Sequence, residues 1–248
     1  MCRRRLPGRS GAADAPAAVA RREALQQAIT ASRNGRPDES LRIVEAIGPE
    51  GDDVVSIRLM TEKALDLGRL RNYPASLAAL RVLMDRVKEL DWPAREAVLL
   101  DNAARFAEAV RDFPLADVYW ERLAAIHRSF PDPIKEGGTL LGLARLRYHQ
   151  GEVGKALRTA RAAVALVRHG GSEDLSGRTY SGLSVYEAAA GDLAKALVCH
   201  EEALQRLSTG PDRTLVAQVM LNAARVQDRL REYGVTLEMA EAALEVLP

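Results

Sequence analysis

A repeat of forty residues runs through most of the chain and limits what it can fold into. Five short turn-like segments, each ending in a small residue, follow one another at that spacing, from RNYPAS to REYGVT. Their last residues are Ser76, Ala116, Ala156, Ala196 and Thr236, and a weaker copy ends at Ser40, thirty-six residues before the first. Self-similarity with a period of roughly 20–50 residues is typical of stacked repeats. We therefore expect a row of similar units, each packed on its neighbours.

Each unit has the pattern of two helices. Further core positions follow the small residue at four and seven residues, as in Ala116, Trp120 and Leu123, and this spacing marks one face of a helix. Upstream of each turn a second segment aligns without gaps, so the NAAR sequences at 102–105 and 222–225 occupy one position, three repeats apart. Hydrophobic residues make up 47% and aromatic residues 4% of the chain. Such a core consists of Ala, Leu and Val, and Ala and Leu favour helices. We predict an all-α fold of about six helix–turn–helix units.

Charge divides the chain into two parts. Residues 1–22 hold six Arg and one Asp, and the remaining 226 residues hold 29 basic and 33 acidic side chains. We expect a disordered basic leader over residues 1–20 and a repeat domain over residues 21–248. The acidic balance of the repeat domain does not favour nucleic acid as a partner. No apolar run is long enough for a membrane span, and no signal peptide is apparent, so we expect a cytoplasmic protein.

The repeat resembles the tetratricopeptide repeat (TPR) family. The resemblance rests on Ala116-x3-Trp120, on the Gly142–Ala144 segment, and on the turn glycines Gly151 and Gly191. The period of forty exceeds the usual period of that family, as in the longer repeats of bacterial regulators and kinesin light chains. The resemblance implies a right-handed α-solenoid whose first helices line a concave groove. It also implies a non-catalytic protein without a cofactor, because such repeats rarely carry chemistry.

The resemblance places a set of polar residues in that groove. Three arginines share one repeat position, and two asparagines lie one turn before them. An Asn amide can bridge a peptide backbone, and Arg binds carboxylate groups through two hydrogen bonds. The predicted ligand-binding residues, including an aromatic pair at the rim, are Asn102, Arg105, Arg145, Tyr148, His149, Asn222 and Arg225. The alternative is structural: the asparagines support helix contacts, and the arginines pair with Asp101, Glu108 or Asp228.

No constellation in the sequence predicts catalysis or metal binding. The histidines are His127, His149, His169 and His200, and none lies four residues from another His or from Cys. Cys199 and His200 are adjacent, but consecutive helical residues point apart, so we expect His200 to be packed in a helix. Trp120 fills the large-residue position of its repeat, and we expect core packing there. We expect loop packing for Trp92, with an exposed anchor as its alternative.

Three functions therefore stay open. The first is a scaffold or adaptor that binds an acidic protein or peptide in the groove. The second is a sensor module of a bacterial signalling or transcription system, responding to a peptide or small ligand. The third is self-assembly as a homodimer through the C-terminal repeat, because stacked repeats need a polar cap and this end is apolar. The apolar residues at that end are Val235, Leu237, Leu244 and Val246.

Overall fold

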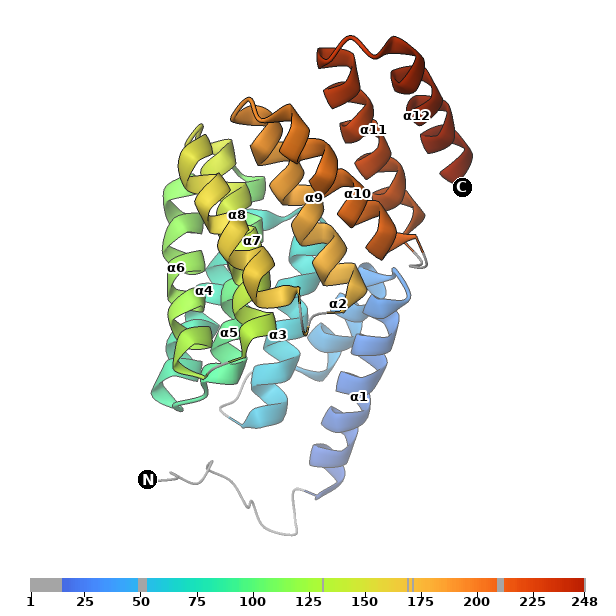
Figure 1. Ribbon diagram of the computed structural model, residues 1–248. Helices are drawn as coiled ribbons and strands as arrows, with labels where there is room; N and C mark the ends of the chain where they lie inside the picture. The colour runs from blue at the N-terminus through green and yellow to red at the C-terminus, as the bar shows by residue number, and fades with distance from the viewer. Residues whose placement is uncertain are drawn as a thin grey trace. The chain divides into compact units, whose positions relative to one another are not determined.

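The computed structural model describes residues 15–48, 53–130, 132–168, 170, 172–208 and 212–247. Within these ranges nearly every residue is helical, and none lies in a strand. The helices, shown in Figure 1, are α1 (Ala15–Arg33), α2 (Pro37–Ile47), α3 (Val54–Arg69), α4 (Tyr73–Glu89), α5 (Pro93–Ala109), α6 (Phe113–Ser129), α7 (Pro133–His149), α8 (Val153–Val167), α9 (Glu173–Ala189), α10 (Leu193–Leu207), α11 (Arg213–Arg229) and α12 (Tyr233–Val246). The described helices form six consecutive pairs, so the predicted all-α repeat fold is confirmed.

The chain divides into two compact units, Met1–Tyr119 and Trp120–Pro248. In the first unit, α3 packs against α1, α2, α4 and α5. In the second unit, each helix from α7 to α12 contacts the next, and α9 also contacts α7 and α11 (Figure 1). Each hairpin therefore covers its apolar face with its neighbours, as expected for stacked repeats.

The turn inside each hairpin contains one residue in the left-handed region. The residues are Gly35, Arg71, Arg111, Gly151, Gly191 and Arg231, and five of the six follow the forty-residue spacing. At Arg111 (φ 62°), its amide donates to the Glu108 carbonyl at 2.9 Å, and the Asp112 amide donates to the Ala107 carbonyl at 2.9 Å. This pattern satisfies the last carbonyls of the helix. Glycine adopts this conformation without steric cost and arginine does not, so three of the turns are strained.

A large residue of one hairpin packs against a glycine of the next. Trp120 of α6 is 0% exposed, which confirms its predicted place in the core. A Cβ atom added at Gly142 of α7 would lie 2.5 Å from the Trp120 ring. The two helices can approach this closely because position 142 has no side chain.

Ion pairs join neighbouring hairpins of the second unit in a regular way. Glu121 of α6 accepts a hydrogen bond from Arg147 of α7 at 2.9 Å. Forty residues later, Arg161 of α8 pairs with Glu187 of α9 at 2.7 Å. The two pairs occupy the same repeat positions with the charges exchanged. A hairpin stacked on the wrong neighbour would bring like charges together, so the alternation favours the observed order.

The start of the chain differs from the prediction in one respect. Helix α1 begins at Ala15, so residues 15–20 are helical although we assigned them to the disordered leader. Four of these six residues are Ala and one is Pro at the second helical position, and both choices suit a helix start. The rest of the predicted leader, residues 1–14, lies outside the described residues, as does His169. Among the described helices, none is both long and apolar enough to cross a membrane.

Candidate functional site

The predicted binding residues all lie on the odd-numbered helices, and they are divided between the two units. Asn102 and Arg105 belong to α5 in the first unit. In the second unit, Arg145, Tyr148 and His149 belong to α7, and Asn222 and Arg225 belong to α11. Helices α7 and α11 each contact α9.

In α5 the predicted residues are occupied by partners within the helix. The Asn102 side-chain amide donates to the Val98 carbonyl at 2.8 Å. Arg105 forms two hydrogen bonds with Asp101, each 3.1 Å long. The expected alternative, an ion pair between Arg105 and Asp101, is therefore confirmed. The charge of Arg105 is balanced by its own helix, so this copy of the NAAR sequence is a weak candidate for an acidic ligand.

In α7 the predicted aromatic pair is divided, because Tyr148 packs into the interior and His149 is exposed. Tyr148 is half-buried, and its ring centroid lies 5.2 Å from that of Tyr186 on α9. It packs against a cluster of buried residues that includes Ala144 and Ala156. His149 is exposed, with its ring centroid 6.1 Å from that of Tyr148, and Arg145 is half-buried. Tyr148 thus joins α7 to α9.

In α11 the NAAR sequence is part of a longer line of polar residues. Gln218, Asn222, Arg225 and Arg229 follow one another at helical spacing on one face, and we call them the α11 stripe. The stripe extends over twelve residues, and its ends are about 16 Å apart at a rise of 1.5 Å per residue. Gln218, Arg225 and Arg229 are exposed, and Asn222 is half-buried.

Hydrogen bonds within the stripe use the side-chain oxygen of Asn222 as their acceptor. The Asn222 side-chain oxygen accepts from Gln218 Nε2 at 3.2 Å and from Arg225 Nη1 at 3.5 Å. The Asn222 amide N–H groups are therefore directed away from both neighbours. Arg229 donates to the Ala188 carbonyl near the end of α9 at 2.7 Å. In the described part of the chain, neither Arg225 nor Arg229 pairs with a carboxylate.

The two copies of NAAR differ in the residue that precedes them. In α5 this residue is Asp101, which binds Arg105. In α11 it is Leu221, which cannot bind a guanidinium. One substitution between equivalent positions therefore decides whether the arginine is neutralised. We did not predict Gln218 and Arg229, although the helical spacing from Asn222 and Arg225 was visible in the sequence.

The buried polar residues of α10 show no arrangement for catalysis. His200 is 2% exposed, and neither ring nitrogen has a hydrogen-bond partner in the described structure. Burial lowers the pKa of His200 to about 4 and raises the pKa of the neighbouring Cys199 thiol to about 11. A protonated thiol is a poor nucleophile. The prediction that His200 is packed in a helix is confirmed. No group of three His, Cys, Asp or Glu side chains among the described residues is arranged to hold a metal ion.

Comparison with known proteins agrees with this architecture. Residues 175–248, which include α9 to α12, match the family model described as tetratricopeptide repeat. These residues carry tetratricopeptide repeats. The preceding hairpins have the same helix pairing, and those from α3 to α8 also have the forty-residue spacing. No curated protein matches the sequence.

Solved structures with the same fold include repeat proteins of several kinds. BtubC from P. vanneervenii is 17% identical with a TM-score of 0.68, over 96% of this chain and 91% of that one. The quorum sensor NprR from B. thuringiensis is 15% identical with a TM-score of 0.74, over 91% and 64% of the respective chains. A signal-transduction ATPase with a TPR sensor from Pyrococcus horikoshii is 15% identical with a TM-score of 0.73, over 89% and 38%. At these identities the similarity shows the fold alone.

Proposed function

We propose that this protein is a non-catalytic TPR scaffold or adaptor that binds an acidic segment of a protein or peptide through the α11 stripe. The observation that carries the proposal is the state of Arg225 and Arg229. Both are exposed, and within the described residues both have only neutral hydrogen-bond partners. Side-chain carboxylates of a ligand would supply the missing negative charge.

The chemistry of the stripe suits a ligand rich in acceptors. A guanidinium group donates up to five hydrogen bonds and accepts none. Asn222 adds two N–H donors, because its oxygen is already bonded to Gln218 and Arg225. An acidic peptide offers carboxylates to the arginines and backbone carbonyls to the asparagine. Charge-assisted hydrogen bonds of this kind are stronger than neutral ones.

The α7 residues extend the proposed contact surface within the second unit. Helix α9 lies between α7 and α11 and presents the half-buried Val185 at the repeat position of Arg145 and Arg225. A ligand that crosses the three helices would contact Arg145, then Val185, then the α11 stripe. His149 offers a further exposed ring at the end of α7. Arg105 is left out of this surface because Asp101 neutralises it.

A pull-down from the native cell lysate tests the proposal when the wild type is compared with matched variants. We expect Arg225→Ala/Arg229→Ala to lose a partner that the wild type captures. Arg105→Ala is the control, since it removes an equivalent arginine that is already paired. We expect this control to keep the partner. Equal capture by all three proteins would contradict the proposal for α11, whereas equal loss would indicate that the arginines act through stability.

A sensor module is the second candidate, favoured by the sensors among the similar folds. NprR is a quorum sensor, and the Pyrococcus horikoshii protein has a TPR sensor. A sensor would change its dimensions on binding a small ligand or peptide. Small-angle scattering with and without the low-mass filtrate of the native lysate measures this directly. A smaller radius of gyration with the filtrate supports the sensor, and an unchanged radius argues against it.

Self-association through α12 is the third candidate. Leu237 and Leu244 are 60% and 70% exposed and lie seven residues apart on the same face. Val246 was predicted to join this face, but it is half-buried against a cluster that includes Ala203, Leu207 and Val219. Its side chain turns toward α10 and α11 because it is two residues from Leu244. Sedimentation equilibrium distinguishes the candidates, since a monomer at every concentration excludes self-association.

A further inference from the structure

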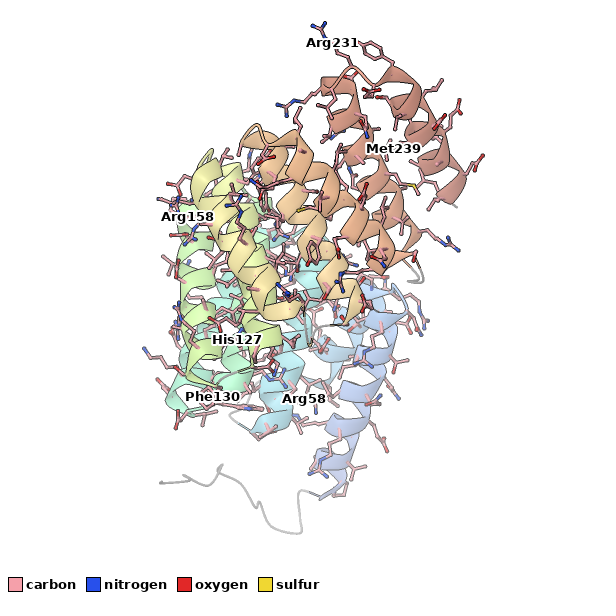
Figure 2. The ribbon with its side chains drawn as sticks, in the orientation of Figure 1. Arg58, His127, Phe130, Arg158, Arg231 and Met239 are labelled. Atoms are coloured by element: carbon pink, nitrogen blue, oxygen red, sulfur yellow. The ribbon has the colours of Figure 1, made fainter. Side chains whose placement is uncertain are left out.

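A second basic cluster lies in the first unit, where α3 and α5 begin. Arg95 is half-buried near the start of α5, and its guanidinium carbon lies 5.1 Å from the centroid of the Trp92 ring. Arg58 extends from the neighbouring helix α3 (Figure 2). Burial and the positive charge of Arg58 both lower the pKa of Arg95. Helices α3 and α5 are in contact, so the exposed Arg58 and the half-buried Arg95 lie on neighbouring helices, each near the start of its helix.

The one carboxylate whose charge acts on both arginines is that of Glu62 on α3. Among the described residues, neither Arg58 nor Arg95 forms a hydrogen bond or an ion pair with an acidic group. Burial raises the pKa of Glu62, and the negative charge of Asp66 adds to this rise, whereas Arg69, Arg95 and Arg58 oppose it. Arg69, which also attracts Glu62, is bound to Asp66 at 2.7 Å. The Glu62 carboxylate therefore attracts both Arg58 and Arg95 but forms an ion pair with neither of them in the described structure.

Another repeat of the chain has an arginine at the position of Arg58 that is paired with carboxylates. Arg178 of α9 lies three repeats after Arg58, and it bonds Asp174 at 2.8 Å and Asp212 at 2.8 Å. These bonds, with the one to Asp174 contributing most, raise the pKa of Arg178. Val54 and Trp92 stand at the corresponding positions around Arg58. The carboxylate on the same helix is thus replaced by an aliphatic side chain, and the one at the start of the next helix by an aromatic ring.

Arg95 is a further difference between the surroundings of Arg58 and those of Arg178. Its counterpart three repeats later is Leu215, which packs against the buried cluster of α10 and α11. Around Arg58 the repeat has therefore lost these two carboxylates and gained a guanidinium and an indole, and Glu62 stands where α9 has Gly182. An arginine stacked on an aromatic ring keeps its N–H groups available at the edge of the guanidinium plane.

We propose that Arg58, Arg95 and Trp92 form a binding site for an oxyanionic group, a carboxylate or a phosphate, carried by a ligand whose apolar part packs against the indole. The two guanidinium groups bind the oxyanion through paired N–H donors. Binding removes the repulsion between the two positive charges. The site lies in the first unit and does not depend on the function proposed for α11.

The test is a titration of the whole chain with glutarate and, separately, with inorganic phosphate, followed by NMR of the Arg Nε–H and Trp indole signals. Sodium chloride at matched ionic strength is the reference. We expect saturable shifts at Arg58, Arg95 and Trp92 with at least one of the two anions, and the anion that saturates identifies the chemistry. We expect no shift at Arg178, which has its two carboxylates. The absence of saturation with both anions, or an equal shift at Arg178, would overturn the proposal.

Two variants separate this site from general attraction to a basic surface. Val54→Asp copies Asp174 and gives Arg58 an internal partner, so we expect about a tenfold or greater loss of anion affinity. Arg58→Ala removes one donor group and we expect a similar loss. Both positions are at least partly exposed near a helix start, and circular dichroism checks that the helices are intact. Unchanged affinity in both variants would contradict the assignment of Arg58.

Discussion

His200 provides a quantitative test of how the repeats are packed. Its imidazole ring is 2% exposed and has no hydrogen-bond partner at either nitrogen within the described structure. Leu80, at the same repeat position, is 0% exposed and apolar. His200→Leu therefore replaces an unsatisfied polar ring by a residue that this fold already accepts. Removing buried unpaired polar groups typically gains about 1–3 kcal/mol, so we expect the variant to be more stable at pH 7.

The pH dependence of stability follows from the lowered pKa of His200. Burial lowers this pKa from 6.5 to about 4. Between these values the unfolded chain binds a proton that the folded chain does not bind, so the free energy of unfolding falls as the pH falls. At about 1.4 kcal/mol per pKa unit, the loss is about 3 kcal/mol at pH 4 and levels off at about 3.5 kcal/mol below it.

Urea unfolding of the wild type and His200→Leu, from pH 7 to pH 4.5, measures this contribution. Carboxylates and the other histidines titrate in both proteins, so the difference between the two curves isolates His200. We expect the wild type to lose about 2.5 kcal/mol more than the variant over this range. Parallel curves would show that His200 is solvated or hydrogen-bonded in solution, which would refute the packing described for α10.

Three further predictions concern single contacts of the repeats, each measured as a change in the free energy of unfolding. Arg111→Gly places glycine at a φ of 62°, and we expect a gain of about 0.5–1 kcal/mol; a loss would contradict the strain assigned to that turn. Gly142→Ala inserts a methyl group against the Trp120 ring, and we expect a loss of about 1–3 kcal/mol, whereas no loss would mean that α6 and α7 are less close. Arg147→Glu opposes Glu121 and is expected to cost about 1 kcal/mol, which Glu121→Arg should restore. Failure of this rescue would show that the pair has no influence on stacking.

The repeat architecture was predictable because it depends on local properties. Small residues, turn residues and apolar spacing recur every forty positions, and each determines a helix or a turn without reference to distant parts of the chain. Left-handed arginines in three turns were harder to predict, since glycine is the usual choice there. They are tolerated because the hydrogen bonds that end the helix hold the turn in place.

The binding residues were predictable only in part, because their chemistry depends on which neighbours carry charge. Aligned arginines suggested one continuous set, but Asp101 neutralises Arg105, whereas Leu221 leaves Arg225 without an acidic residue one turn before it. The stacking of Arg95 on Trp92 joins the start of a helix to the residue before it, and no sequence pattern predicted this contact. The repeat position identifies candidate binding arginines. The side chains one helical turn away determine which of these arginines are already paired with a carboxylate.

The most direct test of the proposed function is the affinity of Leu221→Asp for the partner captured through α11. This variant copies the Asp101–Arg105 pair into α11 and keeps both arginines in the protein. Calorimetry with the purified partner at low salt gives the affinity of the variant and the wild type, with Asp101→Leu as the matched control. The account predicts that Leu221→Asp weakens binding at least about tenfold, since one charge-assisted hydrogen bond contributes about 1.5–3 kcal/mol. Equal affinities of Leu221→Asp and the wild type would contradict it.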